Sequence, residues 1–205
     1  MKVFCIFIVE PISVLQARTC VESGKKWGVD VQLFAGLQGD EVNDLPIDFE
    51  PDASVGLKGC FGSHYSLWKQ CIKDNEHFCI LEHDAIITSP FKNLPIGDML
   101  ELCQPEKNWT NPDKAEYSIM TDAGNPRGTT GYMISPITAK KLVHAAETKK
   151  NVTHADIFMG GVLKRTNAIV PYPVKVAKIP YSTIHTVNKV KYQRQIVKGI
   201  IFDEF

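Results

Sequence analysis

The chain has 205 residues, of which 44% are hydrophobic and 22% charged, as in a globular protein rather than a disordered one. Lysine plus arginine number 23, aspartate plus glutamate also number 23, and the formal net charge is therefore zero. This balance weighs against a protein held on nucleic acid mainly by phosphate contacts, although a local basic face stays compatible with it. The length favours one domain over two small ones.

The chain opens with an apolar run, residues 3–9, which Glu10 and Pro11 close. The run is shorter than the roughly 18 residues that a membrane helix needs, and no small-residue cleavage site follows it. We therefore predict a buried first strand, no transmembrane segment and a cytoplasmic protein. The six cysteines form no Cys-x-x-Cys pair, so a zinc ribbon is not indicated and reduced thiols are expected.

The order of the next elements indicates an α/β fold. Residues 3–9 suit a strand covered on both faces, residues 13–27 have the pattern of a helix, and the alternation over 29–34 predicts a second strand. Strand, helix and strand in this order predict a mostly parallel, Rossmann-type sheet flanked by helices. A long helix over 56–75 and a short apolar strand over 78–81 are expected to follow.

The second half of the chain continues this alternation less regularly. Proline and glycine predict loops at 104–114 and 121–130, and Ser135 followed by Pro136 predicts the start of a helix. The remaining predicted elements are a helix over 94–103, strands over 117–120 and 131–135, helices over 136–150 and 154–166, and a strand over 169–177.

The apolar strand over 78–81 ends abruptly in Glu82, His83 and Asp84. In open α/β sheets ligands bind beyond the carboxyl ends of the strands, and two carboxylates two residues apart can converge on one cation. Oxygen ligands suit Mg²⁺ or Mn²⁺, and Mn²⁺ accepts a nitrogen ligand such as His83 more readily. The alternative is a strand end with two solvated carboxylates, and the spacing alone leaves both open.

The acidic strand end and the helix before it resemble glycosyltransferase family 25, which includes lipooligosaccharide and collagen hydroxylysine galactosyltransferases. The resemblance rests on GCFGSHYSLW at 59–68 and ILEHD at 80–84. Further matches follow in the family's order: LFA at 33–35 with Gly39, TGYMIS at 130–135, Asp156, YP at 172–173 and STI at 182–184. The chain departs from the family at two points. His83 stands where the family's Glu-Asp-Asp triplet has its middle carboxylate, and only Arg18 remains of an early arginine pair.

The resemblance implies a GT-A-like fold and a metal-dependent, inverting transfer of a sugar from a nucleotide donor. It implies a single catalytic domain over 1–205, with a nucleotide-sugar-binding half at 1–88 and an acceptor half and tail at 89–205. The expected cofactor is Mn²⁺ or Mg²⁺, which would neutralise the leaving diphosphate.

The resemblance also assigns roles to acidic and histidine residues. Asp84 is expected to bind the metal, and Glu82 either the metal or the donor ribose. His83 and the late His185 are further candidate metal ligands. Asp156 is the candidate general base, with helix capping as its alternative role. Asp122, in a predicted loop, is the rival base.

Five other residues are candidate contacts to the donor or substrate. Ser63 and His64 lie on the helix before the acidic strand, and packing of His64 in the core is the alternative. Gly131 and Tyr132 would allow the backbone to approach a sugar closely. Arg127 would reach a phosphate, and a solvated loop cation is its alternative.

The combined expectation is a hexosyltransferase that moves galactose or glucose from a UDP-linked donor to a hydroxyl group, with a saccharide as acceptor. Three alternatives remain. One is a degenerate relative that binds nucleotide or sugar without turnover, because His83 replaces a carboxylate. Another is an α/β protein with a structural acidic cluster and no sugar chemistry. The third is transfer to a modified DNA base, which the basic residues near the end would support and the zero net charge disfavours.

Overall fold

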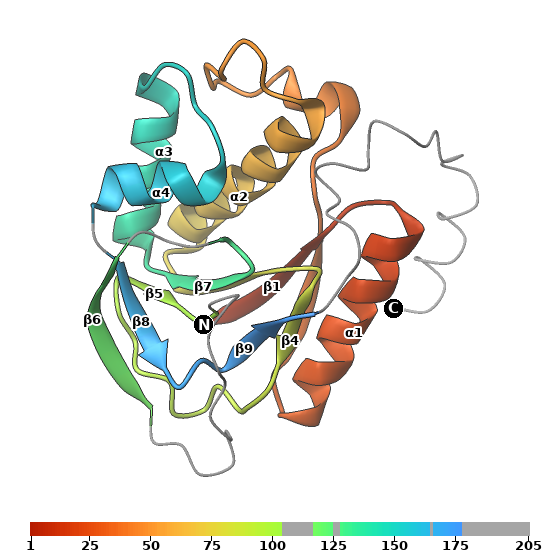
Figure 1. Ribbon diagram of the computed structural model, residues 1–205, viewed down its shortest axis with the longest axis vertical. Helices are drawn as coiled ribbons and strands as arrows, with labels where there is room; N and C mark the ends of the chain where they lie inside the picture. The colour runs from red at the N-terminus through yellow and green to blue at the C-terminus, as the bar shows by residue number, and fades with distance from the viewer. Residues whose placement is uncertain (104–116, 125–127, 165, 178–205) are drawn as a thin grey trace.

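The computed structural model describes residues 1–103, 117–124, 128–164 and 166–177. Its main feature is a seven-stranded sheet in the order β2-β1-β3-β7-β5-β8-β6 (Figure 1). The elements in chain order are β1 (Lys2–Phe7), α1 (Pro11–Lys26), β2 (Val31–Ala35), the 3-10 turn η1 (Gly39–Val42), α2 (Val55–Asp74), β3 (Phe78–Glu82), β4 (Ala85–Ile87), β5 (Met99–Glu101), β6 (Ser118–Gly124), β7 (Gly131–Ile134), α3 (Pro136–Thr148), α4 (Ala155–Leu163), β8 (Thr166–Val170) and β9 (Val174–Val176).

The sheet is mostly parallel. Strands β2, β1 and β3 are mutually parallel, β7 runs antiparallel to both β3 and β5, and β8 is parallel to β5. Thus β2, β1, β3, β5 and β8 point one way, and only β7 and the edge strand β6 oppose them. The expected α/β class, with a mostly parallel sheet flanked by helices, is confirmed, and the order is compatible with the GT-A-like description.

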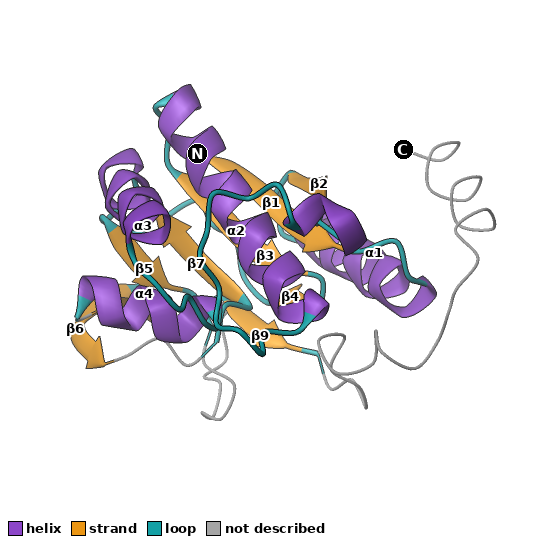
Figure 2. Ribbon diagram, turned by 90° about the horizontal axis from the view of Figure 1, so that it is seen from above, coloured by secondary structure: helices purple, strands orange, loops and turns teal. Residues whose placement is uncertain are grey.

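Alternating side chains of the strands build two cores. Cys79 and Leu81 of β3 pack with α1 on one face, whereas Phe78 and Ile80 pack with α2, α3 and α4 on the other. Seen from above, α1 lies on one side and α3 and α4 on the other, with α2 and the central strands between them (Figure 2). Burial on both faces is the reason that β3 reads as an unbroken apolar run.

Several local predictions are confirmed with small shifts. Helix α2 begins at Val55 with Ser54 as its N-cap and ends at Asp74, where Asn75 takes the left-handed conformation. Ser135 is the N-cap of α3, and its hydroxyl accepts a hydrogen bond from the amide of Thr138 at 3.2 Å. No helix in the described part of the chain combines the length and apolarity needed to cross a membrane.

The predicted helix over 94–103 is wrong, because this segment contains strand β5. Pro95 and Gly97 disfavour a helix there, and Met99 and Leu100 are buried between β7 and β8. The loop predicted over 121–130 is also partly wrong, because β6 continues to Gly124. The segment over 169–177 divides into β8 and β9, and β9 pairs with the unpredicted strand β4.

Candidate functional site

The acidic residues lie at the carboxyl end of the central strand β3. Ile6 of the neighbouring parallel strand β1 pairs with Glu82, the last residue of β3, so the two strands end at the same edge. On the other side, the amide of Glu82 donates to the carbonyl of Thr130, just before β7 begins. This edge is where an open α/β sheet binds ligands.

One carboxylate oxygen of Glu82 is the meeting point of three side chains. Its Oε1 accepts a hydrogen bond from the hydroxyl of Thr129 at 2.6 Å and lies 3.3 Å from Nε2 of His64. The thiol of Cys60 lies 3.9 Å from the same oxygen. Helix α2 supplies Cys60 and His64, which are four residues apart and therefore lie on the same face of the helix.

The other ring nitrogen of His64 belongs to a buried network. Nδ1 of His64 lies 2.9 Å from the hydroxyl of Tyr132, and that hydroxyl accepts a hydrogen bond from Nε1 of Trp68 at 2.8 Å. His64 and Tyr132 are each 1% exposed, and Trp68 is fully buried. If Tyr132 donates to Nδ1, the proton on Nε2 points at Glu82. Every polar side-chain atom of His64, Trp68 and Tyr132 then has a hydrogen-bond partner. The network orients the Glu82 carboxylate.

The surroundings of Glu82 keep it ionised. Burial by itself would raise the pKa of Glu82, but the hydrogen bonds from His64 and Thr129 outweigh it and hold the pKa below its usual value. Because Oε1 receives these bonds and the side chain is 24% exposed, the second oxygen remains available at the strand end. Glu82 can therefore act as an oriented anionic ligand at neutral pH.

Asp84 is in the opposite electrostatic situation. Burial and the charge of Glu82 raise the pKa of Asp84 to about 7. Its Oδ1 is buried and has no hydrogen-bond partner within the described residues. A buried carboxylate oxygen without a donor is costly unless a cation satisfies it. The unpartnered oxygen of Asp84, two residues after the oriented Glu82, is compatible with a bound cation, and a metal site here stays a prediction.

His83 lies between the two carboxylates and is partly buried. Burial lowers its pKa, although the nearby charge of Glu82 works against this effect. A neutral imidazole at neutral pH is the form that binds metals. His83 is thus chemically able to be a ligand, in line with its predicted role.

Asp156 shares the electrostatic field of this strand end. It lies in the first turn of α4, and its Oδ1 accepts a hydrogen bond from the amide of Ile157 at 2.8 Å. His154, not Asp156, is the N-cap residue. The pKa of the Cys60 thiol is raised first by burial and then by the charges of Glu82 and Asp156. The charge of Asp156 therefore acts on the same thiol that contacts Glu82, and its role as a base stays a prediction.

The comparisons with known proteins match the part of the chain that carries these residues. The model of glycosyltransferase family 25 (LPS biosynthesis protein) matches residues 25–106, a segment that contains α2 and the acidic end of β3. Residues 25–106 are therefore similar to glycosyltransferase family 25. The expected family resemblance is confirmed.

Two curated relatives are similar to part of this chain. A glycosyltransferase 25 family member from Aedes aegypti is 24% identical over 152 residues, which are 61% of this chain and 25% of the relative. Procollagen galactosyltransferase 2 from Homo sapiens is 27% identical over 146 residues, 57% of this chain and 23% of that protein. This chain therefore aligns with only about a quarter of the length of these relatives.

A solved structure was also matched. It is a glycosyltransferase involved in the glycosylation of the major capsid of PBCV-1, with 11% sequence identity and a TM-score of 0.37. The match covers 72% of this chain and 68% of that one.

Within the matched segment, Ser63 has a structural position. Its hydroxyl accepts a hydrogen bond from the amide of Leu37 at 2.9 Å and donates one to the carbonyl of Gly59 at 2.6 Å. A Cβ on Gly36 would lie only 2.8 Å from this hydroxyl. Ser63 thereby ties the loop after β2 to helix α2 at the edge that carries Glu82.

Gly131 and Tyr132 are packed inside the sheet. A Cβ at Gly131 would lie 3.2 Å from Leu81 and 3.3 Å from Val174, so the missing side chain allows β3 and β9 to pack closely. Tyr132 points its hydroxyl at His64 and Trp68. Their predicted contacts to a sugar remain predictions, and the contacts in this structure are internal ones.

Three predicted site residues have no described side chain, so their place relative to the site stays a prediction. Asp122 lies within β6, and its side chain is outside the described residues. Arg127 and His185 lie outside the described residues altogether.

The structure adds two residues that the sequence analysis did not assign, Thr129 and Cys60. The antiparallel pairing of Leu81 with Gly131 carries Thr129 past the end of β3, where it meets Glu82. The spacing of Cys60 and His64 was a signal that both face the same way, but it did not indicate what they face.

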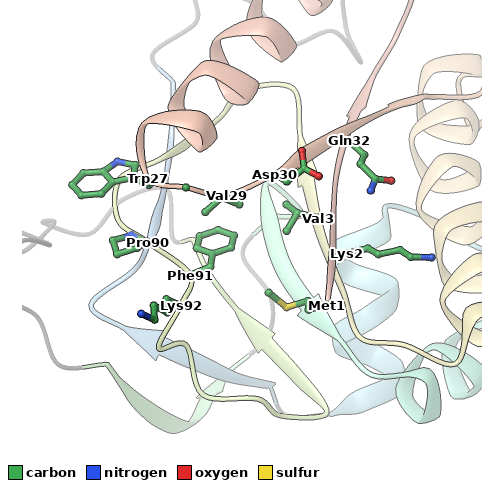
Figure 3. Close-up of a pocket in the computed structure, with 11 residues that line it drawn as sticks. Met1, Lys2, Val3, Trp27, Val29, Asp30, Gln32, Pro90, Phe91 and Lys92 are labelled. Atoms are coloured by element: carbon green, nitrogen blue, oxygen red, sulfur yellow. The ribbon is translucent and has the colours of Figure 1, made fainter. Parts of the chain in front are cut away.

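A cavity of about 530 Å³ lies at the opposite edge of the sheet, at the amino ends of β1 and β2 (Figure 3). Figure 3 shows Lys2, Val29, Asp30 and Phe91 among the residues that line it. Because β1 and β3 are parallel, this cavity is separated from Glu82 by the length of the strands. It is not part of the acidic site.

Proposed function

We propose that this chain is a metal-dependent, inverting glycosyltransferase that moves a hexose from a UDP-linked donor to a hydroxyl group of an acceptor. The observation that carries the proposal is the pairing of an oriented Glu82 with the unpartnered, buried Oδ1 of Asp84, within a family 25 segment. Galactose and glucose are the proposed sugars, and a saccharide is the proposed acceptor. The human relative is named a galactosyltransferase, which supports the choice of galactose.

Glu82, His83 and Asp84 are the residues that would hold Mn²⁺ or Mg²⁺, with His185 as a further proposed ligand. A bound divalent cation would supply neutralisation of the charge on the departing diphosphate. The chain itself contributes an oriented carboxylate, because Thr129 and His64 hold Oε1 of Glu82. Tyr132 and Trp68 stabilise the orientation of His64, and we assign them a positioning role.

Asp156 is the proposed general base, with Asp122 as its rival. In the transfer, a carboxylate oxygen of the base takes the proton from the acceptor hydroxyl, and the hydroxyl oxygen bonds to the anomeric carbon. The bond between that carbon and the diphosphate oxygen breaks, and its electron pair leaves with the diphosphate. One displacement from the opposite face inverts the anomeric centre. The charge of Asp156 raises the pKa of Cys60, whose thiol contacts Glu82, and this effect supports the proposed role.

Ser63, His64, Gly131, Tyr132 and Arg127 complete the proposed donor side. We propose that Ser63 acts by holding the loop after β2, and that His64 acts through Glu82. The proposal includes a single domain, with a donor half at 1–88 and an acceptor half at 89–205. It also includes a cytoplasmic location. A nucleic-acid acceptor is not favoured by the zero net charge.

A binding protein without turnover is the second candidate. It is favoured by one observation, the presence of His83 where the family resemblance calls for a carboxylate. Fewer charges at the site would weaken the hold on a hard cation. The two candidates differ in turnover and agree in binding.

Calorimetry with UDP, UDP-galactose and UDP-glucose, with and without Mn²⁺, tests the proposal. We expect binding that needs Mn²⁺ and is lost in Asp84→Asn. Asp30→Asn, at the opposite edge of the sheet, is the matched control and should bind as the wild type does. Release of UDP from a bound donor separates the transferase from the binding protein. Failure of every nucleoside diphosphate to bind would overturn both.

A further inference from the structure

The side chains of Cys60, His64 and Glu82 form a cluster with the donor atoms of a metal site. Each offers one ligand atom, and the three atoms lie within 4.8 Å of one another. The separation from His64 Nε2 to Glu82 Oε1 is 3.3 Å and from Cys60 Sγ to the same oxygen 3.9 Å. Ligands about 2.0–2.3 Å from one tetrahedral ion are separated by roughly 3.3–3.7 Å, so only small side-chain movements are needed.

The ligand chemistry of this cluster differs from that of the acidic set Glu82, His83 and Asp84. A thiolate and an imidazole are soft or intermediate ligands that select zinc, whereas Mg²⁺ and Mn²⁺ prefer oxygen. Two ligands one turn apart on α2 and a third on β3 are held by separate elements, so the arrangement does not depend on a loop. The cluster therefore indicates a different ion from the one proposed for Asp84.

The residues behind these ligands have the positions that metal sites require. Metal-bound histidines usually donate their second ring N–H to a fixed acceptor. Here the Tyr132 hydroxyl lies 2.9 Å from Nδ1 of His64, and a hydroxyl oxygen can accept from both His64 and Trp68. Thr129 holds the carboxylate of Glu82 at 2.6 Å. His64 and Glu82 are thus already oriented.

The charges balance as well. A dication bound by one thiolate, one carboxylate and a neutral imidazole forms a cluster of zero net charge. Burying a neutral cluster costs far less than burying an isolated ion. Entry from solvent is open because the side chains of Cys60 and Glu82 are both partly exposed.

We propose that Cys60, His64 and Glu82 form a Zn²⁺ site at the carboxyl end of β3, with a water molecule as the fourth ligand. On binding, Cys60 loses its thiol proton to solvent and its sulfur bonds to the ion. The proton of His64 moves from Nε2 to Nδ1, and Glu82 binds as the carboxylate. One proton is released per ion, and no oxidation or reduction takes place.

The test uses the full, reduced, metal-free chain with Co²⁺ as a spectroscopic probe and Zn²⁺ in competition with a chromophoric chelator. We expect one ion per chain, a thiolate-to-cobalt charge-transfer band, and release of one proton in calorimetry across buffers of different ionisation heat. Cys60→Ser should abolish the band and lower the Zn²⁺ affinity at least about tenfold. Tyr132→Phe should lower the affinity by about 10–100-fold, the usual effect of removing such a partner.

Two control variants make the result specific. Cys71→Ser, at a buried thiol on the same helix, should keep the band and the affinity. Asp84→Asn should also keep them, because Asp84 belongs to the proposed donor site and not to the zinc site, whereas Glu82 belongs to both. Circular dichroism checks that each variant is folded. Absence of the cobalt band in the wild type, or an equal loss in Cys71→Ser and Cys60→Ser, would overturn the proposal.

Discussion

Nε2 of His64 lies 3.3 Å from Oε1 of Glu82, so a buried helix residue contacts the last residue of the central strand. The contact joins the core to the acidic edge. Behind it, Tyr132 and Trp68 extend the same network into the packed interior. The same hydrogen-bond network therefore contributes to the stability of the core and orients Glu82 for its proposed function. Separate substitutions test these two contributions.

Tyr132→Phe should destabilise the protein by about 1–3 kcal/mol. The ring keeps its packing, but Nε1 of Trp68 and Nδ1 of His64 lose their partner inside the core. Urea unfolding measures the change. His144→Ala, at an exposed position of α3, is the control and should stay within about 0.5 kcal/mol of the wild type. Equal stability of Tyr132→Phe and the wild type would mean that water replaces the hydroxyl.

Gly131→Ala should cost about 1–3 kcal/mol of stability, because its Cβ would press on Leu81 and Val174 at 3.2 and 3.3 Å. Gly161→Ala, in α4, should be neutral or gain up to about 1 kcal/mol, because its added Cβ would meet no described atom within 4 Å apart from its chain neighbours and the helix's own backbone. Thermal unfolding of the pair compares the same added methyl group in two environments. Similar effects at both sites would contradict the packing role of Gly131.

The protein should lose stability as the pH rises from about 8.5 to 11. Burial raises the pKa of Cys71 to about 11 and, together with nearby carboxylates, that of Cys103 to about 12. Free thiols titrate near ~8.5, so above this pH the unfolded chain holds fewer protons than the folded one. The free energy of unfolding then falls as pH increases.

Urea unfolding in reductant at pH 7 to 10 measures this dependence. Each thiol contributes at most about 1.4 kcal/mol per pH unit. Cys71→Val should therefore show a shallower fall than the wild type. An identical slope in Cys71→Val and the wild type would assign the alkaline loss to other groups.

Asp156→Asn should lower the turnover number by about 10²–10⁴-fold and leave the donor KM nearly unchanged, as expected for loss of a general base. A sugar-transfer assay with saturating Mn²⁺ measures both constants, with Asp30→Asn as the control for a lost surface charge. A change in donor KM alone would assign Asp156 to binding. Unchanged kinetics would shift the base to another residue, for which Asp122 is the first choice.

Glu82→Gln should weaken Mn²⁺-dependent donor binding by at least about tenfold, because the amide keeps the shape but removes the charge. The hydrogen-bonded partners Thr129 and His64 can still reach an oxygen, so the fold should survive. Calorimetry gives the affinity and circular dichroism the folded state. Retained affinity in Glu82→Gln would leave Asp84 as the principal ligand.

Local patterns in the sequence determined much of the fold. The unbroken apolar run of β3 predicted a strand buried on both faces, and Ser135 before Pro136 predicted the start of α3. The same stretch placed Glu82 and Asp84 at a strand end, where a ligand site is expected. These features depend on neighbours along the chain, since periodicity and caps act within a few residues.

Tertiary structure alone decided which of these residues meet. Pairing of β7 with β3 brought Thr129 and Tyr132 to Glu82 and His64, and the packing of α2 on the sheet added Cys60. The strand β5 was missed for the same reason, because three residues between β7 and β8 are a strand only through their partners. Long-range pairing is set by which surfaces bury each other, and no local pattern carries that information.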